Sequence, residues 1–163
     1  MKYLPRLNRK IERPVPYAFG FSLCGFLAFA LQELPYLPWA LWPPPNNPLA
    51  GNTAPYLWLE IAEKVAGILT VVVLIFIVRK NAAKFIRNRF FLLAAICLTF
   101  YYASWIAYFA GCTNGWLIVL GLSALAPIYY LCVALGLQNK PAVIPCAIFI
   151  VVHTSLNTLN FLL

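Results

Sequence analysis

Residues 57–78 constrain the fold more than any other part of the chain. The segment reads LWLEIAEKVAGILTVVVLIFIV and is apolar except for Glu60, Glu63 and Lys64 near its start. As a helix rising about 1.5 Å per residue it would be roughly 33 Å long, which matches a hydrocarbon core of about 30 Å. A charge near the bilayer centre costs on the order of 3 kcal/mol, so these charges need partners, water or a function. We therefore predict a membrane-spanning helix that carries a polar site.

The composition indicates a polytopic membrane protein. Of 163 residues, 63% are hydrophobic and only 10% are charged, whereas soluble domains carry about 25% charged residues. The net charge of +8 would suggest nucleic-acid binding in a soluble protein. Here the basic residues lie almost entirely in the N-terminal flank and the connectors, where membrane topology explains them. We expect a lipid bilayer as partner and no nucleic acid.

The apolar segments predict an all-α fold, a bundle of five transmembrane helices that forms one domain after a flank at residues 1–16. The expected spans are about 17–33, 57–78, 90–110, 116–137 and 142–163. A four-span alternative stays open, because Ala28-Phe29-Ala30 has the small-x-small pattern of a signal-peptide cleavage site. The long proline-rich connector at 33–56 is expected to lie on the membrane surface, as a stiff linker or as a lid over a pocket.

The basic residues predict the orientation. They gather in the N-terminal flank, in the connector at 79–89 and at Lys140, while the other connectors contain no Lys or Arg. By the positive-inside bias, the flank is cytoplasmic, the N-terminus is inside and the C-terminus is outside. The expected location is a plasma membrane or a bacterial inner membrane.

Polar and aromatic residues recur at helical spacing in three of the predicted spans: Glu60, Glu63 and Lys64 in the second, Tyr101, Trp105 and Tyr108 in the third, and His153, Asn157 and Asn160 in the fifth. Such stripes on apolar helices are expected to face the bundle interior, in the outer half of the membrane. We therefore predict a polar cluster between the second, third and fifth helices. Its candidate ligand-binding residues are Glu60, Glu63, Lys64, Tyr101, Tyr102, Trp105, His153 and Asn157.

Several functions fit this cluster. It can be purely structural, with Glu60 and Lys64 paired at i,i+4 and with His and Asn bonding between helices. That interpretation leaves Glu63 without a compensating charge. The alternative is an outward-open pocket that binds, or helps to transport, a small polar or cationic ligand. A further alternative is an accessory or protective subunit of a membrane complex, or a homo-oligomer, that acts through its small-residue faces and its outer loop.

Intramembrane catalysis by Glu63 and His153 is the least favoured interpretation. F-x-x-x-H and H-x-x-x-N around His153 resemble motif fragments of the CAAX-protease-like intramembrane family. Both fragments share one His where that family uses two, and no Arg follows the Glu60-x-x-Glu63 pair, so the resemblance assigns no activity. The five scattered cysteines have no metal-site spacing. We expect no metal or other cofactor.

Overall fold

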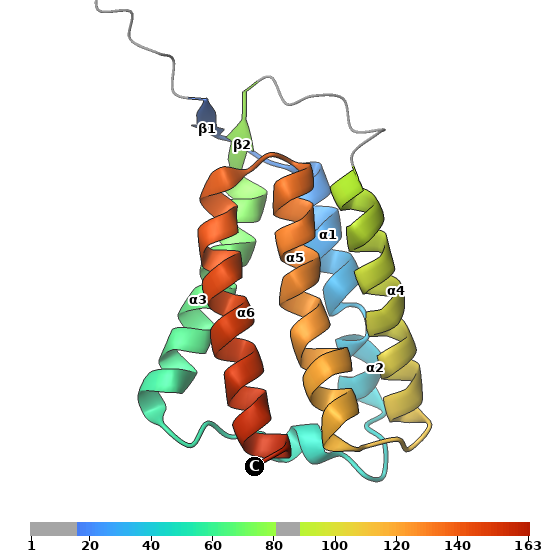
Figure 1. Ribbon diagram of the computed structural model, residues 1–163. Helices are drawn as coiled ribbons and strands as arrows, with labels where there is room; N and C mark the ends of the chain where they lie inside the picture. Colours follow the sequence, from blue (N-terminus) through green and yellow to red (C-terminus); the bar gives the residue numbers. More distant parts are fainter. Residues whose placement is uncertain (1–15, 81–88) are drawn as a thin grey trace, which may run out of the picture.

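The computed structural model describes residues 16–80 and 89–163, and the chain there is mostly helical. Helices α1, α3, α4, α5 and α6 lie side by side along the long axis of the molecule, and the short helix α2 lies near one end (Figure 1). Their bounds are α1 Leu23–Glu33, α2 Tyr36–Leu41, α3 Leu57–Phe76, α4 Arg89–Phe109, α5 Leu125–Gly136 and α6 Lys140–Phe161. The most extensive contacts join α4 to α5 and α3 to α6. Nearly all of the predicted cytoplasmic flank and most of the basic connector lie outside the described residues.

Within residues 16–80 and 89–163, three helical segments are long and apolar enough to cross a membrane. They are Arg89–Phe109, Leu117–Gly136 and Lys140–Phe161, close to three of the predicted spans. Helix α3 also begins where predicted and is 20 residues long. It is not among these three segments, and it contains three charged residues, Glu60, Glu63 and Lys64. These three segments support the sequence-based prediction of a helical membrane protein.

The first predicted span is wrong in its N-terminal part. Residues Tyr17–Phe19 form strand β1, which pairs antiparallel with β2, Ile77–Arg79. Helix α1 therefore begins only at Leu23, and α3 ends at Phe76, where the second span was expected to continue as helix. Hydropathy cannot separate a short apolar strand from a helix end. The strand pair closes the end of the bundle opposite the C-terminus (Figure 1).

The connector after α1 is partly helical and not simply a surface loop. Leu34 and Pro35 keep helical backbone angles, with φ of −53° and −67°, before α2 begins. Pro35 and Pro38 have no N–H to donate, so the helical hydrogen bonds are interrupted there. Figure 1 shows α2 beyond the end of α1, on the side of the C-terminus. Together they form a broken helix, after which a 3₁₀ turn, η1 (Pro48–Gly51), follows.

The helix that ends in α5 begins with a π-helical segment, η3, which spans Leu117–Ala124. Pro127 lies just beyond it and is buried. Segment η3 packs tightly on α4, because a Cβ added at Gly121 would lie 2.3 Å from the Ser104 hydroxyl oxygen. π-Helical turns are frequent at functional sites, and η3 contributes to one of the cavities described below.

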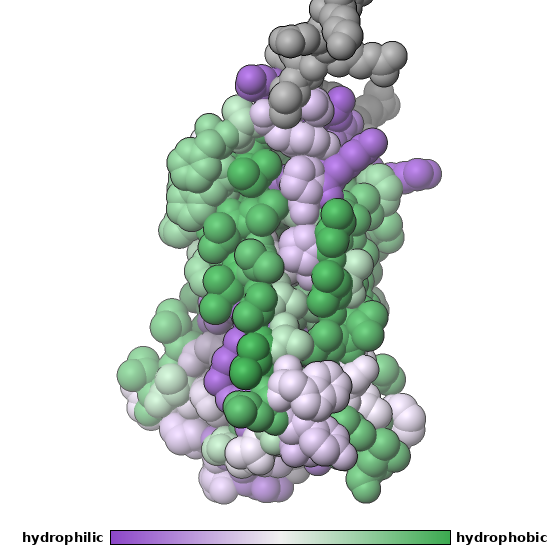
Figure 2. Space-filling view, turned by 90° about the vertical axis from the view of Figure 1, so that its left-hand side faces the viewer, coloured by the Kyte–Doolittle hydropathy of each residue, from purple (hydrophilic) through white to green (hydrophobic). Residues whose placement is uncertain are grey.

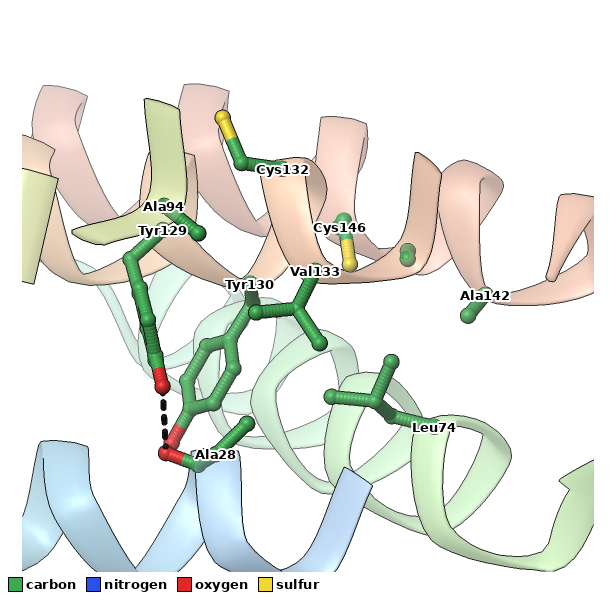
Figure 3. Close-up of a cluster of buried hydrophobic side chains, with 10 residues drawn as sticks. Ala28, Leu74, Ala94, Tyr129, Tyr130, Cys132, Val133, Ala142 and Cys146 are labelled. Carbon is green, nitrogen blue, oxygen red and sulfur yellow. Dashed lines mark hydrogen bonds between the residues drawn. The ribbon is translucent and has the colours of Figure 1, made fainter. Parts of the chain in front are cut away.

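The core consists of two apolar clusters. In one, drawn in Figure 3, Tyr129 and Tyr130 reach from α5 toward α1, and the Tyr129 hydroxyl donates to the Ala28 carbonyl at 3.2 Å. The other contains Tyr101, Trp105 and Tyr108 of α4, all at most 2% exposed. The prediction that these three aromatic residues face inward is therefore confirmed.

Candidate functional site

The central feature of the candidate site is a pair formed by Glu63 and His153. The packing of α3 on α6 brings the Glu63 Oε1 atom to 2.5 Å from His153 Nδ1. Their side chains are 20% and 19% exposed. Gly67, one turn from Glu63, permits this approach, because a Cβ there would lie 3.3 Å from the Phe149 ring of α6. Both residues belong to the polar cluster predicted from the sequence, and the structure brings them into contact.

A first cavity, which we call the loop cavity, has a volume of about 120 Å³. Residues of α2, the connector after it, α4, η3 and α6 form its wall. Its polar groups come from Asn52, Ser123, His153 and Asn157, and its aromatic groups from Tyr36, Trp39 and Trp105. Tyr36 and Trp105 contact each other edge to face, with ring centroids 5.1 Å apart. Aromatic walls with a few convergent polar groups are typical of small-ligand sites.

A second cavity, the break cavity, lies at the interruption between α1 and α2 and has a volume of about 140 Å³. Its wall contains Gln32, Glu33, Tyr36, Gly67, Val71, Ala126, Tyr130, Phe149 and His153. Tyr36 and His153 line both cavities, so the two spaces adjoin. Within the described ranges, Glu33 forms no ion pair with a basic residue. The break cavity therefore contains a carboxyl group that no basic residue of the described ranges pairs with.

The contact with Glu63 determines what His153 presents to the cavities. Because Nδ1 is held by the carboxylate, Nε2 is the ring nitrogen that a ligand or water can reach. In the neutral tautomer that donates to Glu63, Nε2 is an acceptor, and in the protonated ring it is a donor. Glu63 itself lines neither cavity. It acts on the site through the orientation and charge of His153.

Gln32 connects the broken helix to the rest of the bundle. Its amide nitrogen donates to the Tyr101 hydroxyl at 2.9 Å, and its amide oxygen accepts from the Tyr130 hydroxyl at 2.6 Å. All three side chains are buried. Tyr101 lines neither cavity, but it bonds to Gln32, which lines the break cavity. This network fixes α1 against α4 and α5 next to the break.

Side-chain amides of the connector after α2 bond to residues of α2, α4 and α6 at and beside the loop cavity. Asn52 donates to the Asn157 amide oxygen at 3.0 Å and accepts from Asn160 at 2.5 Å. Asn47 accepts from Trp39 at 3.0 Å and from the Tyr108 hydroxyl at 2.8 Å. Asn52 and Asn157 are both cavity residues and bond to each other. A ligand that needs either amide has to compete with this contact.

Three of the predicted site residues lie elsewhere. Glu60 and Lys64 form an ion pair at 2.5 Å whose side chains are 39% and 65% exposed, so the prediction that Lys64 faces the bundle interior is wrong. Successive side chains of an α-helix point in directions about 100° apart. Glu63 can therefore contact α6 while Lys64 is exposed. Tyr102 donates to the Leu31 carbonyl and lines an apolar groove of about 400 Å³ outside α2 and α4. Trp105, His153 and Asn157 do line the loop cavity.

The structure adds cavity residues that the sequence analysis did not select, among them Gln32, Glu33, Tyr36, Asn52 and Ser123. Gln32 and Glu33 end an otherwise apolar segment directly before two prolines, and this is the signal that could have identified them. The Ser123 hydroxyl donates to the backbone carbonyl of His153 at 3.3 Å. It is thus not paired with the imidazole ring as a nucleophile would be. Among the described residues, no His, Cys, Asp and Glu group could hold a metal ion.

Comparisons with protein-family models, with curated proteins and with solved structures find no match to this chain.

Proposed function

We propose that the chain is a multi-pass membrane protein that binds a small organic cation in the two adjoining cavities and helps to move it across the membrane. The observation that carries this proposal is the position of His153, which lines both cavities while Glu63 holds its ring. A ligand in either cavity would contact this ring. Binding would therefore depend on the charge of the Glu63–His153 pair.

The proposed membrane placement uses five spans, formed by α1 with α2, then α3, α4, η3 with α5, and α6. The strand end of the bundle carries Arg79, Lys80, Arg89 and Lys140. The connectors at the other end, residues 34–56 and 110–116, contain no Lys or Arg. This asymmetry favours the strand end as cytoplasmic and the C-terminus as external, in a plasma or bacterial inner membrane. Both cavities would then lie in the outer half or near the centre.

Charge and aromatic content favour a cation as the ligand. Glu33 supplies a carboxylate to the break cavity, and Tyr36, Tyr130 and Phe149 surround the same space. Aromatic faces attract cations, and the attraction increases when the cation is removed from water. A low-dielectric interior also strengthens the Coulomb attraction of a carboxylate. The two volumes suit a small ammonium group and not a large solute.

The broken helix supports a part in transport. Interrupted transmembrane helices with polar residues at the break form substrate and ion sites in many transporters. Here the break between α1 and α2 places Glu33 and Tyr36 in the wall of the break cavity. A bundle of this size has little interior for a complete alternating-access cycle, so transport would require a second copy or another membrane protein.

Calorimetric titration of the purified protein in lipid nanodiscs tests the proposal. The probes are ammonium, methylammonium and tetramethylammonium chlorides, with sodium chloride as the ionic-strength control. We expect saturable binding of at least one organic cation, weakened by Glu33→Gln and by Glu63→Gln. Glu60→Gln is the matched control, because Glu60 lines neither cavity and pairs with Lys64 and not with a cavity residue. Absence of binding to the folded protein, or equal binding by all three variants, would overturn the proposal.

One observation favours a second candidate, an interaction subunit of a membrane complex. The Glu60–Lys64 pair lies on the outward face of α3 and away from the cavities. In a bilayer this face would need a polar partner or contact with the headgroup region. The two candidates do not exclude each other, since they use different surfaces of the same helix.

A further inference from the structure

Glu33 is an acidic side chain for which the described part of the chain provides no partner. Of the four acidic residues of the sequence, three lie in the described ranges. Glu60 pairs with Lys64 and Glu63 pairs with His153, whereas no side-chain hydrogen bond or ion pair joins Glu33 to another residue of these ranges. Glu33 is partly buried in the wall of the break cavity. Its carboxyl group is therefore available to a ligand there.

The titratable side chains around Glu33 come from every helix that packs at the break. They are Tyr36 of α2, Glu63 of α3, Tyr101 of α4, Tyr130 of α5 and His153 of α6. Of these groups His153 alone can carry a positive charge, and its Nδ1 atom is held by Glu63. A charge on His153 is therefore balanced by Glu63. It does not compensate a second carboxylate at Glu33.

The position of Glu33 in its helix also acts against a negative charge. Glu33 is the last residue of α1, and the last turn of α1 contains no basic residue. The C-terminal end of a helix carries a partial negative charge, which disfavours a carboxylate and favours a cation at the same place. A carboxylate that leaves water without a counter-charge takes up a proton, because the neutral acid is less costly to bury. Both effects favour the neutral acid when no cation is bound.

The outer surface of the bundle limits how a cation can reach this group. Figure 2 shows a largely hydrophobic surface on the side where α3 lies, with a hydrophilic patch in its lower half. In the membrane placement proposed above, lipid covers the hydrophobic part of this surface. A cation would then reach Glu33 through the two adjoining cavities, which share Tyr36 and His153.

We propose that Glu33 exchanges a proton for the organic cation, so that the carboxyl group is neutral without the cation and releases its proton when the cation binds. In this step the O–H bond of the carboxyl group breaks, the electron pair stays on the carboxylate oxygen, and the proton leaves to water. The cation then pairs with the carboxylate. This inference rests on the proposed function and adds the proton as the ion that is exchanged. The exchange couples movement of the cation to the proton gradient across the membrane.

Calorimetric titration in two buffers of different ionisation enthalpy counts the protons released per cation bound. The probe is tetramethylammonium chloride, which has no acidic proton of its own, and the protein is the full chain in lipid nanodiscs. We expect release of up to about one proton per cation, and an affinity that rises with pH by at most about tenfold per unit, because the two ions compete for one carboxylate. Glu33→Gln should lose the proton release, and the control Glu60→Gln should keep it. Release that persists in Glu33→Gln would assign the proton to the Glu63–His153 pair and overturn the proposal.

Infrared difference spectroscopy gives an answer even if Glu33→Gln binds too weakly for calorimetry. Addition of tetramethylammonium to the wild-type protein should remove the C=O absorption of a protonated carboxyl group and add the absorption of a carboxylate. This change should be missing from Glu33→Gln and present in Glu60→Gln. Binding without the spectral change or without proton release would overturn the exchange and leave the proposed function intact. Absence of binding would contradict the proposed function together with the exchange that rests on it.

Discussion

The Glu63 carboxylate holds Nδ1 of His153 at 2.5 Å, and the same imidazole ring lines both cavities of the bundle. The contact joins α3 to α6 and leaves Nε2 for a ligand or water. It also gives Glu63 a hydrogen-bond partner on another helix. The site therefore depends on a helix–helix contact as much as on the residues that line the cavities.

Glu63→Gln should lower stability more than Glu60→Gln. Glutamine keeps an acceptor for His153 but removes the charge from a bond whose partners are about one-fifth exposed, so we expect a loss of about 1–2 kcal/mol. Glu60 belongs to an exposed pair, and its replacement should cause little change in the monomer. Unfolding in mixed micelles titrated with sodium dodecyl sulfate measures both. Equal losses would show that the contact with His153 contributes nothing specific.

Gln32→Leu should destabilise the bundle by about 1–3 kcal/mol, because it leaves the buried hydroxyls of Tyr101 and Tyr130 without their shared partner. Leu31→Ala is the control on the same helix, since Leu31 is 44% exposed and faces outward. The free energies of unfolding of both variants can be compared in the same micelles. A Gln32→Leu variant as stable as the wild type would contradict the assigned network.

Gly25→Ala should disrupt the contact between α1 and α3. A Cβ at Gly25 would lie 2.4 Å from the Leu74 carbonyl oxygen, and a backbone atom cannot rotate away. Moving the helices apart should cost about 1–3 kcal/mol. Gly51→Ala meets nothing within 4 Å and should be neutral. Thermal unfolding midpoints of the two variants in detergent check the difference, and similar midpoints would argue against this close approach.

Asn52→Ala should make the loop cavity easier to enter, because Asn52 lines the cavity and its amide bonds to Asn157 and Asn160. The readout is the rate at which a thiol introduced by His153→Cys reacts with a reagent added from outside. Asn46→Ala is the control in the same connector, since Asn46 bonds to Thr113 and does not line either cavity. Equal acceleration of the thiol reaction in the two variants would show that the contacts of Asn52 do not restrict access to the cavity.

Much of the helical organisation could be predicted from the sequence. Apolar runs of sufficient length gave the start of α3 and the positions of the last three long helical segments to within a few residues. The helical spacing of Tyr101, Trp105 and Tyr108 gave the inward face of α4. These features depend on local hydropathy and period, which a single sequence contains. Membrane insertion and the number of spans are not tested by such agreement.

The features that the sequence did not reveal depend on contacts between distant segments. Strand β1 forms only because Tyr17–Phe19 lies next to Ile77–Arg79. The inward face of α3 is defined by its buried Ala66 and Thr70, which place Glu63 toward α6 and Lys64 outward. These small residues could have indicated the direction. Glu33 lines the break cavity because α1 ends at this residue, where Pro35 interrupts the helical hydrogen bonds before α2 begins.

The most direct test of the account is the reactivity of single cysteines at positions 153 and 151 in intact cells, with the native cysteines replaced. His153 lines both cavities, whereas Val151 is 64% exposed on the outer surface of the same helix. We expect a membrane-impermeant thiol reagent added from outside to label the His153→Cys variant and not the Val151→Cys variant, because lipid covers the latter. Labelling at Val151→Cys would contradict the membrane placement. No labelling at His153→Cys in a correctly inserted chain would contradict the water-accessible cavity.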